Sequence, residues 1–186
     1  MNSNSIKLCV LWICLLGLSI PARAHEGGLS PETLKKLVPE AENFVTRQKT
    51  LSPQAISKVE QASGTKVQAV DRNLTVYVGI AKDSQTGKTR SVGAVLMVDA
   101  KGVLGSIDLV VAYGLDGTVK KVLITKNKDD KSLESAVFLK QLEGKRPSDA
   151  WDLQKDFNLA GNPASAREVI IAVRRGMHLL LAFMNP

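Results

Sequence analysis

The spacing of apolar residues separates a helical first part of the chain from a β-rich middle. Two segments of the first part begin with Ser-Pro, at Ser30-Pro31 and Ser52-Pro53, and a serine N-cap followed by proline is typical of a helix start. Apolar residues then recur at helical intervals, and a further helical piece is expected over residues 41–45. We therefore predict an N-terminal helical segment over residues 25–64, ended by Gly64.

Runs rich in β-branched residues follow this segment. They cover residues 65–70, 74–81, 92–98, 105–113 and 118–125. Asp116-Gly117 separates the last two runs and is a strong hairpin-turn signal, while Gly93 inside the third run indicates a β-bulge or a close backbone approach. Strands joined by hairpins, without regular alternation of strand and helix, favour an α+β fold with an antiparallel β-sheet and helices packed on it.

Helical spacing returns in the C-terminal third of the chain. A helix is expected over residues 132–143, with Gly144 as its C-cap and its apolar residues facing inward. These inward residues are Leu133, Ala136, Val137, Leu139 and Leu142. The charged loop before this helix, at residues 126–131, is expected to be a solvated surface cluster.

The start of the last helix carries the most informative residues. Asn162 is a good N-cap, Pro163 suits the first helical position, and apolar residues recur at helical spacing from residue 169 to residue 181. A helix start leaves backbone N–H groups with a partial positive charge, which can hold a phosphate or another anion. Ser165 and Arg167 lie in the same first turn. An ordinary capped helix packed on a sheet is the alternative interpretation.

Residues 1–24 have the features of a secretory signal peptide. Lys7 precedes an apolar run over residues 8–20, and Ala22-Arg23-Ala24 matches a small-x-small cleavage signal. The apolar run is too short to span a bilayer comfortably. Cleavage would make His25 the mature N-terminus and place the protein in the periplasm or outside the cell. An uncleaved signal anchor is the alternative.

Composition excludes several classes of function. Both cysteines, Cys9 and Cys14, lie in the signal segment, so the mature protein would have no disulfide and no thiolate metal site. The formal net charge of +7 falls by two to +5 when Lys7 and Arg23 are removed, and this modest basic excess suits an anionic ligand or peripheral contact with an anionic membrane. Aromatic residues make up only 4% and the basic residues are scattered among acidic ones, so no nucleic-acid binding is expected.

Several short blocks between residues 92 and 183 match a known family pattern. They are Gly105-x-Ile107, the Asp116-Gly117 hairpin, Phe138-Leu139-x-Gln141-Leu142-x-Gly144-Lys145, Gly161 with Ser165, and Ala172-Val173. On these residues the chain resembles the FMN-binding domain of the exported flavin subunits of sodium-pumping NADH:quinone reductases and Rnf-type electron-transport complexes. The resemblance implies that residues 65–186 form an FMN-binding-like α+β domain.

The chain departs from this family at the residue that carries the flavin. The family threonine that takes a phosphoester bond to FMN aligns with Pro163, which has no side-chain oxygen, so covalent attachment there is excluded. The resemblance then implies non-covalent FMN binding, with the phosphate held at the helix start. The phosphate-binding residues would be Gly161, Asn162, Pro163, Ala164, Ser165 and Arg167. The flavin ring would lie in an apolar slot formed by Phe138, Leu139 and Trp151.

The resemblance implies an electron carrier that works with a membrane electron-transport complex or a cytochrome, because a flavin ring passes one or two electrons. No residue is a compelling catalytic acid, base or nucleophile, and no metal site is expected. Two alternatives stay open. The protein could be a flavin-free structural or docking module of a periplasmic redox system, or a copper-handling protein that uses the amine and imidazole of a mature N-terminal His25.

Overall fold

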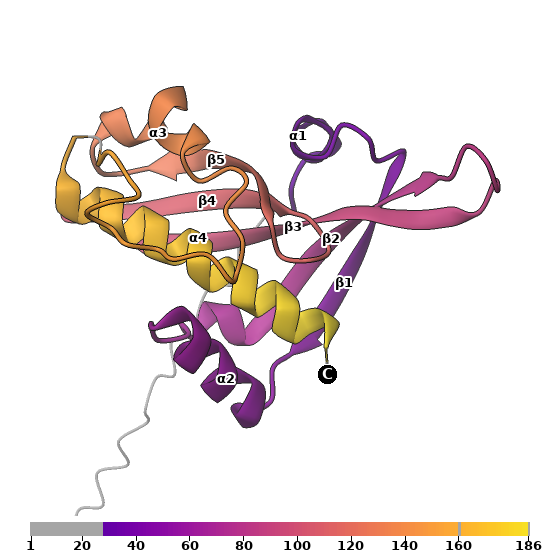
Figure 1. Cartoon of the computed structure of the whole chain (residues 1–186), viewed down its shortest axis with the longest axis horizontal. Helices are drawn as coiled ribbons and strands as arrows, with labels where there is room; N and C mark the ends of the chain where they lie inside the picture. Colours follow the sequence, from indigo (N-terminus) through magenta and orange to yellow (C-terminus); the bar gives the residue numbers. More distant parts are fainter. Residues whose placement is uncertain (1–27, 160, 186) are drawn as a thin grey trace, which may run out of the picture.

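The computed structural model of the chain describes residues 28–159 and 161–185. Its centre is a five-stranded antiparallel sheet in the order β1-β2-β3-β4-β5, so that strands adjacent in sequence are adjacent in space (Figure 1). The strands are β1 (Asn43–Thr50), β2 (Asn73–Lys82), β3 (Thr89–Lys101), β4 (Ser106–Tyr113) and β5 (Val119–Asn127). This confirms the expected α+β class.

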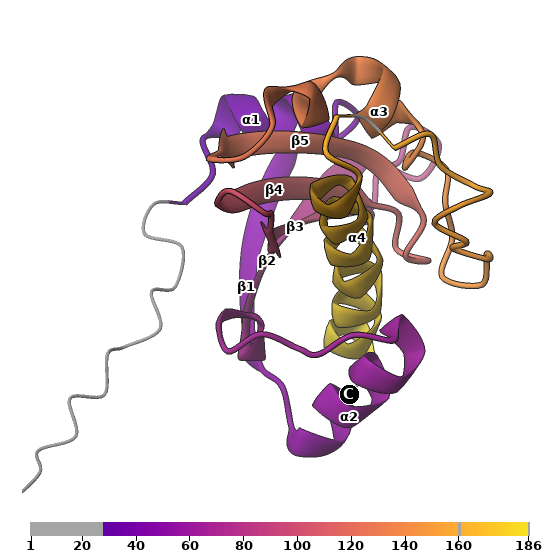
Figure 2. The ribbon, with the colours of Figure 1, turned by 90° about the vertical axis from the view of Figure 1, so that its left-hand side faces the viewer.

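Helices cover both faces of the sheet. They are α1 (Pro31–Leu37), α2 (Pro53–Ser63), α3 (Ala136–Lys140) and α4 (Pro163–Met184), with the short 3₁₀ helices η1 (Val70–Arg72) and η2 (Lys131–Glu134). The long helix α4 crosses one face with α2 beside it, whereas α1 lies on the opposite face (Figures 1 and 2). Within the described ranges, no helix has the length and apolar content needed to cross a membrane.

Two apolar cores follow from the alternation of side chains along the strands. On β4, Ile107, Leu109 and Val111 belong to the larger core beneath α4, whereas Val110 and Ala112 belong to the smaller core beneath α1. All five side chains are fully buried. Because helices cover both faces, β4 is a nearly continuous apolar run rather than an alternating one.

α4 approaches the sheet most closely at Gly176. The fully buried Tyr113 of β4 donates its hydroxyl to the carbonyl of Val173 at 3.1 Å. A side chain at Gly176 would overlap that hydroxyl, so glycine is required for this approach. Burial raises the pKa of Tyr113, and the hydroxyl therefore stays protonated and able to donate.

A buried ion pair also fixes the same helix, at the residue just before Gly176. Arg175 Nε lies 2.9 Å from Asp71 Oδ2, and the two side chains are only 4% and 3% exposed. Arg175 Nη2 also donates to the carbonyl of Asp99 at 2.7 Å. Through these contacts α4 is bonded to η1 and to β3.

The predictions made from local signals are largely confirmed. Ser30, Ser52 and Asn162 are N-caps, each with a side chain that accepts a backbone N–H of its helix. Gly117 has a φ of +83° in the β4–β5 turn. The register of β2 and β3 shifts directly beside Gly93, which confirms the expected bulge.

Two predictions for the first half of the chain are wrong. Residues 41–45 do not form a helix, because β1 begins at Asn43 and pairs with β2 along its whole length. The predicted N-terminal helical segment therefore contributes a strand to the same sheet as the later residues. Residues 65–70 do not form a strand, since the left-handed Gly64 ends α2 and the chain then runs into η1.

The helix predicted over residues 132–143 is divided into η2 and α3. Ser135 has an extended backbone conformation that interrupts it, and the Ser135 side chain caps α3 instead. As a result Val137 points outward and is 77% exposed, whereas Phe138 is buried. The expected signal peptide of residues 1–24, His25 and Ala160 lie outside the described residues.

Candidate functional site

The first backbone amides of α4 are occupied by the protein itself. The side chain of Asn162 accepts hydrogen bonds from the amides of Ala164 at 3.0 Å and Ser165 at 3.4 Å. The amide of Ala166 donates to the Asn162 carbonyl at 3.0 Å, and Pro163 has no N–H to offer. The N-cap predicted from the sequence is therefore present, and it uses the amides that were expected to hold a phosphate.

A carboxylate from a distant loop completes this cap. Asp130 Oδ2 accepts the amide of Asn162 at 2.8 Å, and Asp130 Oδ1 accepts the amide of Ser132 at 2.9 Å. The hydrogen bond from Ser132 is the main reason that the pKa of Asp130 is lowered. Gly161 has a φ of +52° and lies so close to Asp130 and Ser132 that a side chain there would overlap both.

The neighbouring Asp129 binds the turn between β3 and β4. Asp129 Oδ2 accepts the amides of Leu104 at 2.5 Å and Gly105 at 3.2 Å. The fully buried Ser165 accepts the amide of Val103 at 3.0 Å and hydrogen-bonds to Asp129. Burial acts to raise the pKa of Asp129, but the hydrogen bonds from Ser165 and the backbone amides outweigh it, so the pKa is lowered.

We call Asp129 and Asp130 the acidic latch, because together they join three segments at one end of the molecule. These segments are the β3–β4 turn, the loop after β5 and the start of α4, which lie side by side in the end-on view of Figure 2. The sequence predicts a solvated surface cluster for this loop, but Asp129 and Asp130 are partly buried and accept backbone amides of other segments. The only local signal was the adjacent pair of aspartates just after a strand and just before Ser132.

The residues at the start of α4 do not fit a flavin phosphate. Their amides already have acceptors, the Ser165 hydroxyl is buried and hydrogen-bonded, and Arg167 lies exposed on the outer side of the helix. An incoming phosphate would also meet the negative charges of Asp129 and Asp130, and the Asp130 carboxylate already accepts an amide at the positive end of the helix dipole. The six expected phosphate-binding residues are close together, but they form a closed helix cap.

The residues expected to hold the flavin ring belong to the protein core. Phe138, Leu139 and Trp151 are 1%, 9% and 8% exposed and are packed in the larger core. The Trp151 ring lies 5.7 Å from that of Phe157, and Lys145 Nζ lies 4.9 Å from the centre of the Phe157 ring. These aromatic side chains contact each other and a cation, so they fill the core rather than line a slot.

Three large apolar side chains are exposed in the β3–β4 turn and on α3. Val103 and Leu104, in the β3–β4 turn, are 60% and 76% exposed, and Val137 on the nearby α3 is also exposed. Asp129 holds the backbone of Leu104, and Ser165 holds that of Val103. The turn is therefore fixed in a conformation that presents two apolar side chains to solvent.

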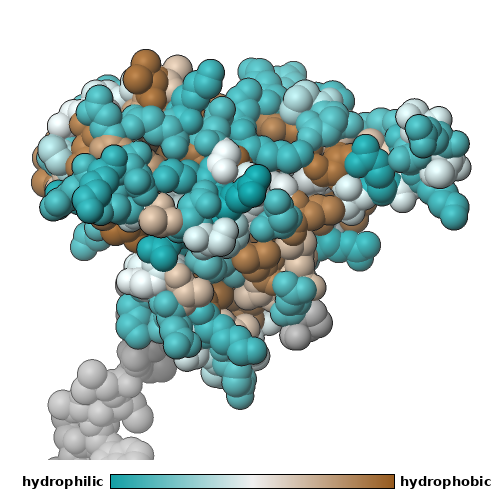
Figure 3. All heavy atoms as spheres, in the orientation of Figure 1, coloured by the Kyte–Doolittle hydropathy of each residue, from teal (hydrophilic) through white to brown (hydrophobic). Residues whose placement is uncertain are grey.

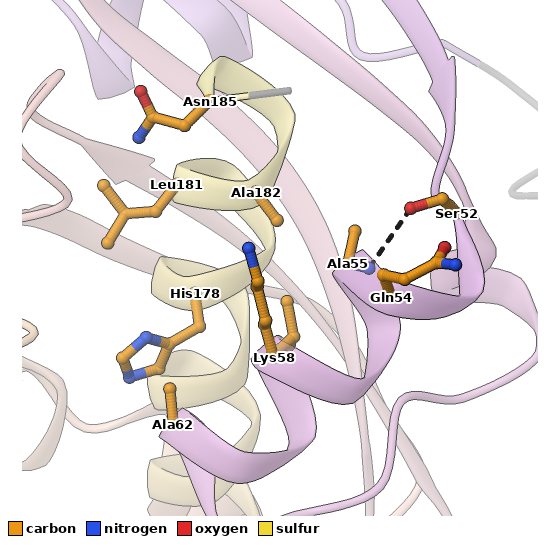
Figure 4. Close-up of a pocket in the computed structure, with 10 residues that line it drawn as sticks. Ser52, Gln54, Ala55, Lys58, Ala62, His178, Leu181, Ala182 and Asn185 are labelled. Atoms are coloured by element: carbon orange, nitrogen blue, oxygen red, sulfur yellow. Dashed lines mark hydrogen bonds between the residues drawn. The ribbon is translucent and has the colours of Figure 1, made fainter.

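A separate cavity lies between α2 and the C-terminal half of α4 (Figure 4). Its volume is about 370 Å³. Lys58 reaches across it from α2 toward α4, and His178, Leu181 and Asn185 line it from α4. Burial, with a smaller contribution from the charge of Arg174, lowers the pKa of His178, so the imidazole is neutral at neutral pH.

The described residues contain no group of three histidine, cysteine, aspartate or glutamate side chains that could hold a metal ion. His25, on which the copper hypothesis depends, is not among them. The similarity searches add no family: no protein-family model matches the chain, and no curated protein matches it significantly.

Proposed function

We propose that this protein is an exported, flavin-free docking module of a membrane redox system. The observation that carries the proposal is the acidic latch, which closes the helix start that would hold a flavin phosphate and also fixes the exposed apolar β3–β4 turn. The resemblance to FMN-binding domains supports the choice of a redox partner, a membrane electron-transport complex or a cytochrome. A fold can be retained when the binding site that it carried is lost.

Closure of the helix start supports a flavin-free module on electrostatic grounds. A helix N-terminus attracts an anion because its first amides are unpaired and carry partial positive charge. Here Asn162 accepts two of these amides, and the Asp130 carboxylate supplies the negative charge from within the chain. Phosphate binding would require breaking these hydrogen bonds and placing two charged groups of the same sign side by side.

Exposure of Val103 and Leu104 supports a docking role. Single exposed apolar residues are common on protein surfaces, but grouped ones mark interaction sites. These two residues are adjacent, and their backbone amides donate to the buried Ser165 and the charged Asp129. The fold therefore keeps both side chains in water, although exposing apolar surface is unfavourable. We infer that they insert into an apolar depression of the partner.

Flavin titration tests the first half of the proposal. The mature chain, purified after periplasmic expression, is titrated with FMN and separately with riboflavin, while flavin fluorescence and absorbance are recorded. We expect no saturable change with either flavin and an intact mass equal to that of the unmodified chain. Stoichiometric FMN binding by the wild-type protein would refute the flavin-free assignment and favour an FMN electron carrier.

Site-specific photo-crosslinking tests the second half. A photoreactive amino acid is placed at Leu104 in one variant and at Leu115 in the control, because Leu115 is also exposed, at 42%, but lies in the β4–β5 turn. We expect a crosslink from position 104 to a membrane redox protein, identified by mass spectrometry, and no such product from position 115. Equal products from both positions, or no product from position 104, would contradict the proposed docking surface.

A further inference from the structure

The cavity between α2 and α4 has the composition of a ligand site. Its volume of about 370 Å³ falls within the range of small-molecule pockets, which combine apolar walls with a few polar groups. Ala55 and Ala62 of α2 and Leu181 and Ala182 of α4 form its apolar part. Figure 3 shows apolar residues reaching the surface over the C-terminal half of α4, within a mostly hydrophilic face.

Hydrogen-bond donors without internal partners surround this apolar surface. The Lys58 ammonium makes no ion pair with any described residue, and the side-chain amides of Gln54 and Asn185 make no hydrogen bond within the described part of the chain. Among the described residues that line the cavity, Lys58 is the only charged one and none carries a carboxylate. The cavity is therefore positively charged and rich in donors.

The nearby end of α4 does not repel an anion. Helix C-termini carry partial negative charge on their last carbonyl groups. Here Lys49 Nζ donates to the carbonyls of Ala182 at 3.0 Å and Phe183 at 2.9 Å, which offsets that charge from within the protein. His178, on the wall of the cavity, is neutral and contributes no positive charge of its own. Lys58 is therefore the cation that the described lining of the cavity offers to a ligand.

We infer that this cavity binds a small monocarboxylate with an apolar body. The carboxylate would pair with the Lys58 ammonium and accept from the amides of Gln54 and Asn185, while the apolar body would cover Leu181 and the alanines. One ammonium matches one negative charge, and the aliphatic walls match an acyl chain or an aromatic ring. This inference does not depend on the proposed docking function, because it concerns a different part of the molecule.

The experiment uses octanoate as the probe and octanol as its uncharged counterpart, titrated into the mature wild-type chain and followed by calorimetry and by the imidazole NMR signals. We expect saturable octanoate binding that shifts the His178 signal, and binding of octanol weaker by about tenfold. Equal binding of octanol, or no saturable binding of octanoate, would overturn the inference. Tighter binding of octyl phosphate than of octanoate would overturn the choice of a monocarboxylate.

Two variants test the location. Lys58→Met keeps the aliphatic stem of the side chain but removes its charge, and Ala62→Leu fills the cavity; each is expected to weaken octanoate binding by about tenfold. Lys36→Met on α1 is the matched control, because Lys36 is also an exposed helical lysine whose ammonium pairs with no described residue, and it should bind like wild type. Binding that survives both changes, or that falls equally in the control, would place the ligand elsewhere and refute the site.

Discussion

Replacing Gly176 with alanine tests how tightly α4 is seated on the sheet. Alanine is the better helix former by about 1 kcal/mol, so helix propensity alone predicts stabilisation. The added Cβ, however, would overlap the Tyr113 hydroxyl and lie 3.0 Å from Val98 Cγ1. Overpacking costs about 1–3 kcal/mol, and displacing a buried hydroxyl from its acceptor costs about as much again. We therefore expect a net loss of roughly 3 kcal/mol in the free energy of unfolding.

A double-mutant cycle separates this mechanism from general disruption. Tyr113→Phe alone should cost about 1 kcal/mol, because it removes one buried hydrogen bond. It also removes the atom that overlaps the new Cβ, and the nearest ring atom, Tyr113 Cζ, is then 3.2 Å away. The double variant should therefore be more stable than Gly176→Ala alone, with a coupling energy of about 2 kcal/mol.

The assay is urea unfolding of the mature chain followed by circular dichroism, with melting temperatures as a second measure. For a domain of this size, 1 kcal/mol corresponds to a shift of about 2–4 °C. Tyr77→Phe combined with Gly176→Ala is the control, because Tyr77 is the other buried tyrosine and lies in the core on the opposite face. The reasoning fails if Gly176→Ala is as stable as wild type, or if its effect simply adds to that of Tyr113→Phe.

Three further predictions concern charged groups. Because the pKa of Asp130 is lowered in the folded protein, its carboxylate contributes fully to stability above the ordinary pKa of 3.8, and this contribution is lost as the pH falls below that value. Asp130→Asn should therefore reduce the dependence of stability on pH in the acid range, measured by urea unfolding. Arg175→Met removes the guanidinium from the buried Asp71 and should cost about 3 kcal/mol, part of which the double variant with Asp71→Asn should restore in the same assay. Lys49→Met removes the cation from the last carbonyls of α4 and should accelerate amide hydrogen exchange in the final helical turn, without changing exchange in the first turn.

Predictions from the sequence succeeded where a short stretch of chain determines the structure. The N-caps of α1, α2 and α4 and the turn at Asp116-Gly117 depend on two to four neighbouring residues, and the structure contains all of them. The strand β1 was missed because its partner determines it. Its side chains are mostly exposed, so it lacks the apolar alternation of an internal strand, and pairing with β2 decides its conformation.

The candidate site likewise combines features that neighbouring residues determine with one that a distant residue determines. Asn162 and Pro163 were correctly assigned to the start of α4, but whether the adjacent amides are free depends on Asp130, which lies 32 residues earlier in the sequence. A capping pattern is the same in a helix that binds an external anion and in one that uses an internal carboxylate. The sequence can therefore predict the helix start, but only the tertiary contact decides whether it is open.

Both ends of α4 are neutralised by side chains of the same protein. At the N-terminus, Asn162 and Asp130 accept the amides of the first turn and its flank, and at the C-terminus, Lys49 donates to the last carbonyls. A helix attracts charged ligands at its ends because its terminal groups are unpaired, and here they are paired. A ligand can still bind along the side of α4, in the cavity where the Lys58 ammonium of α2 lies near Leu181. Because the amides at the start of α4 are paired and the Lys58 ammonium pairs with no described residue, a small anion should bind in this cavity rather than at the helix start that the sequence pattern indicated.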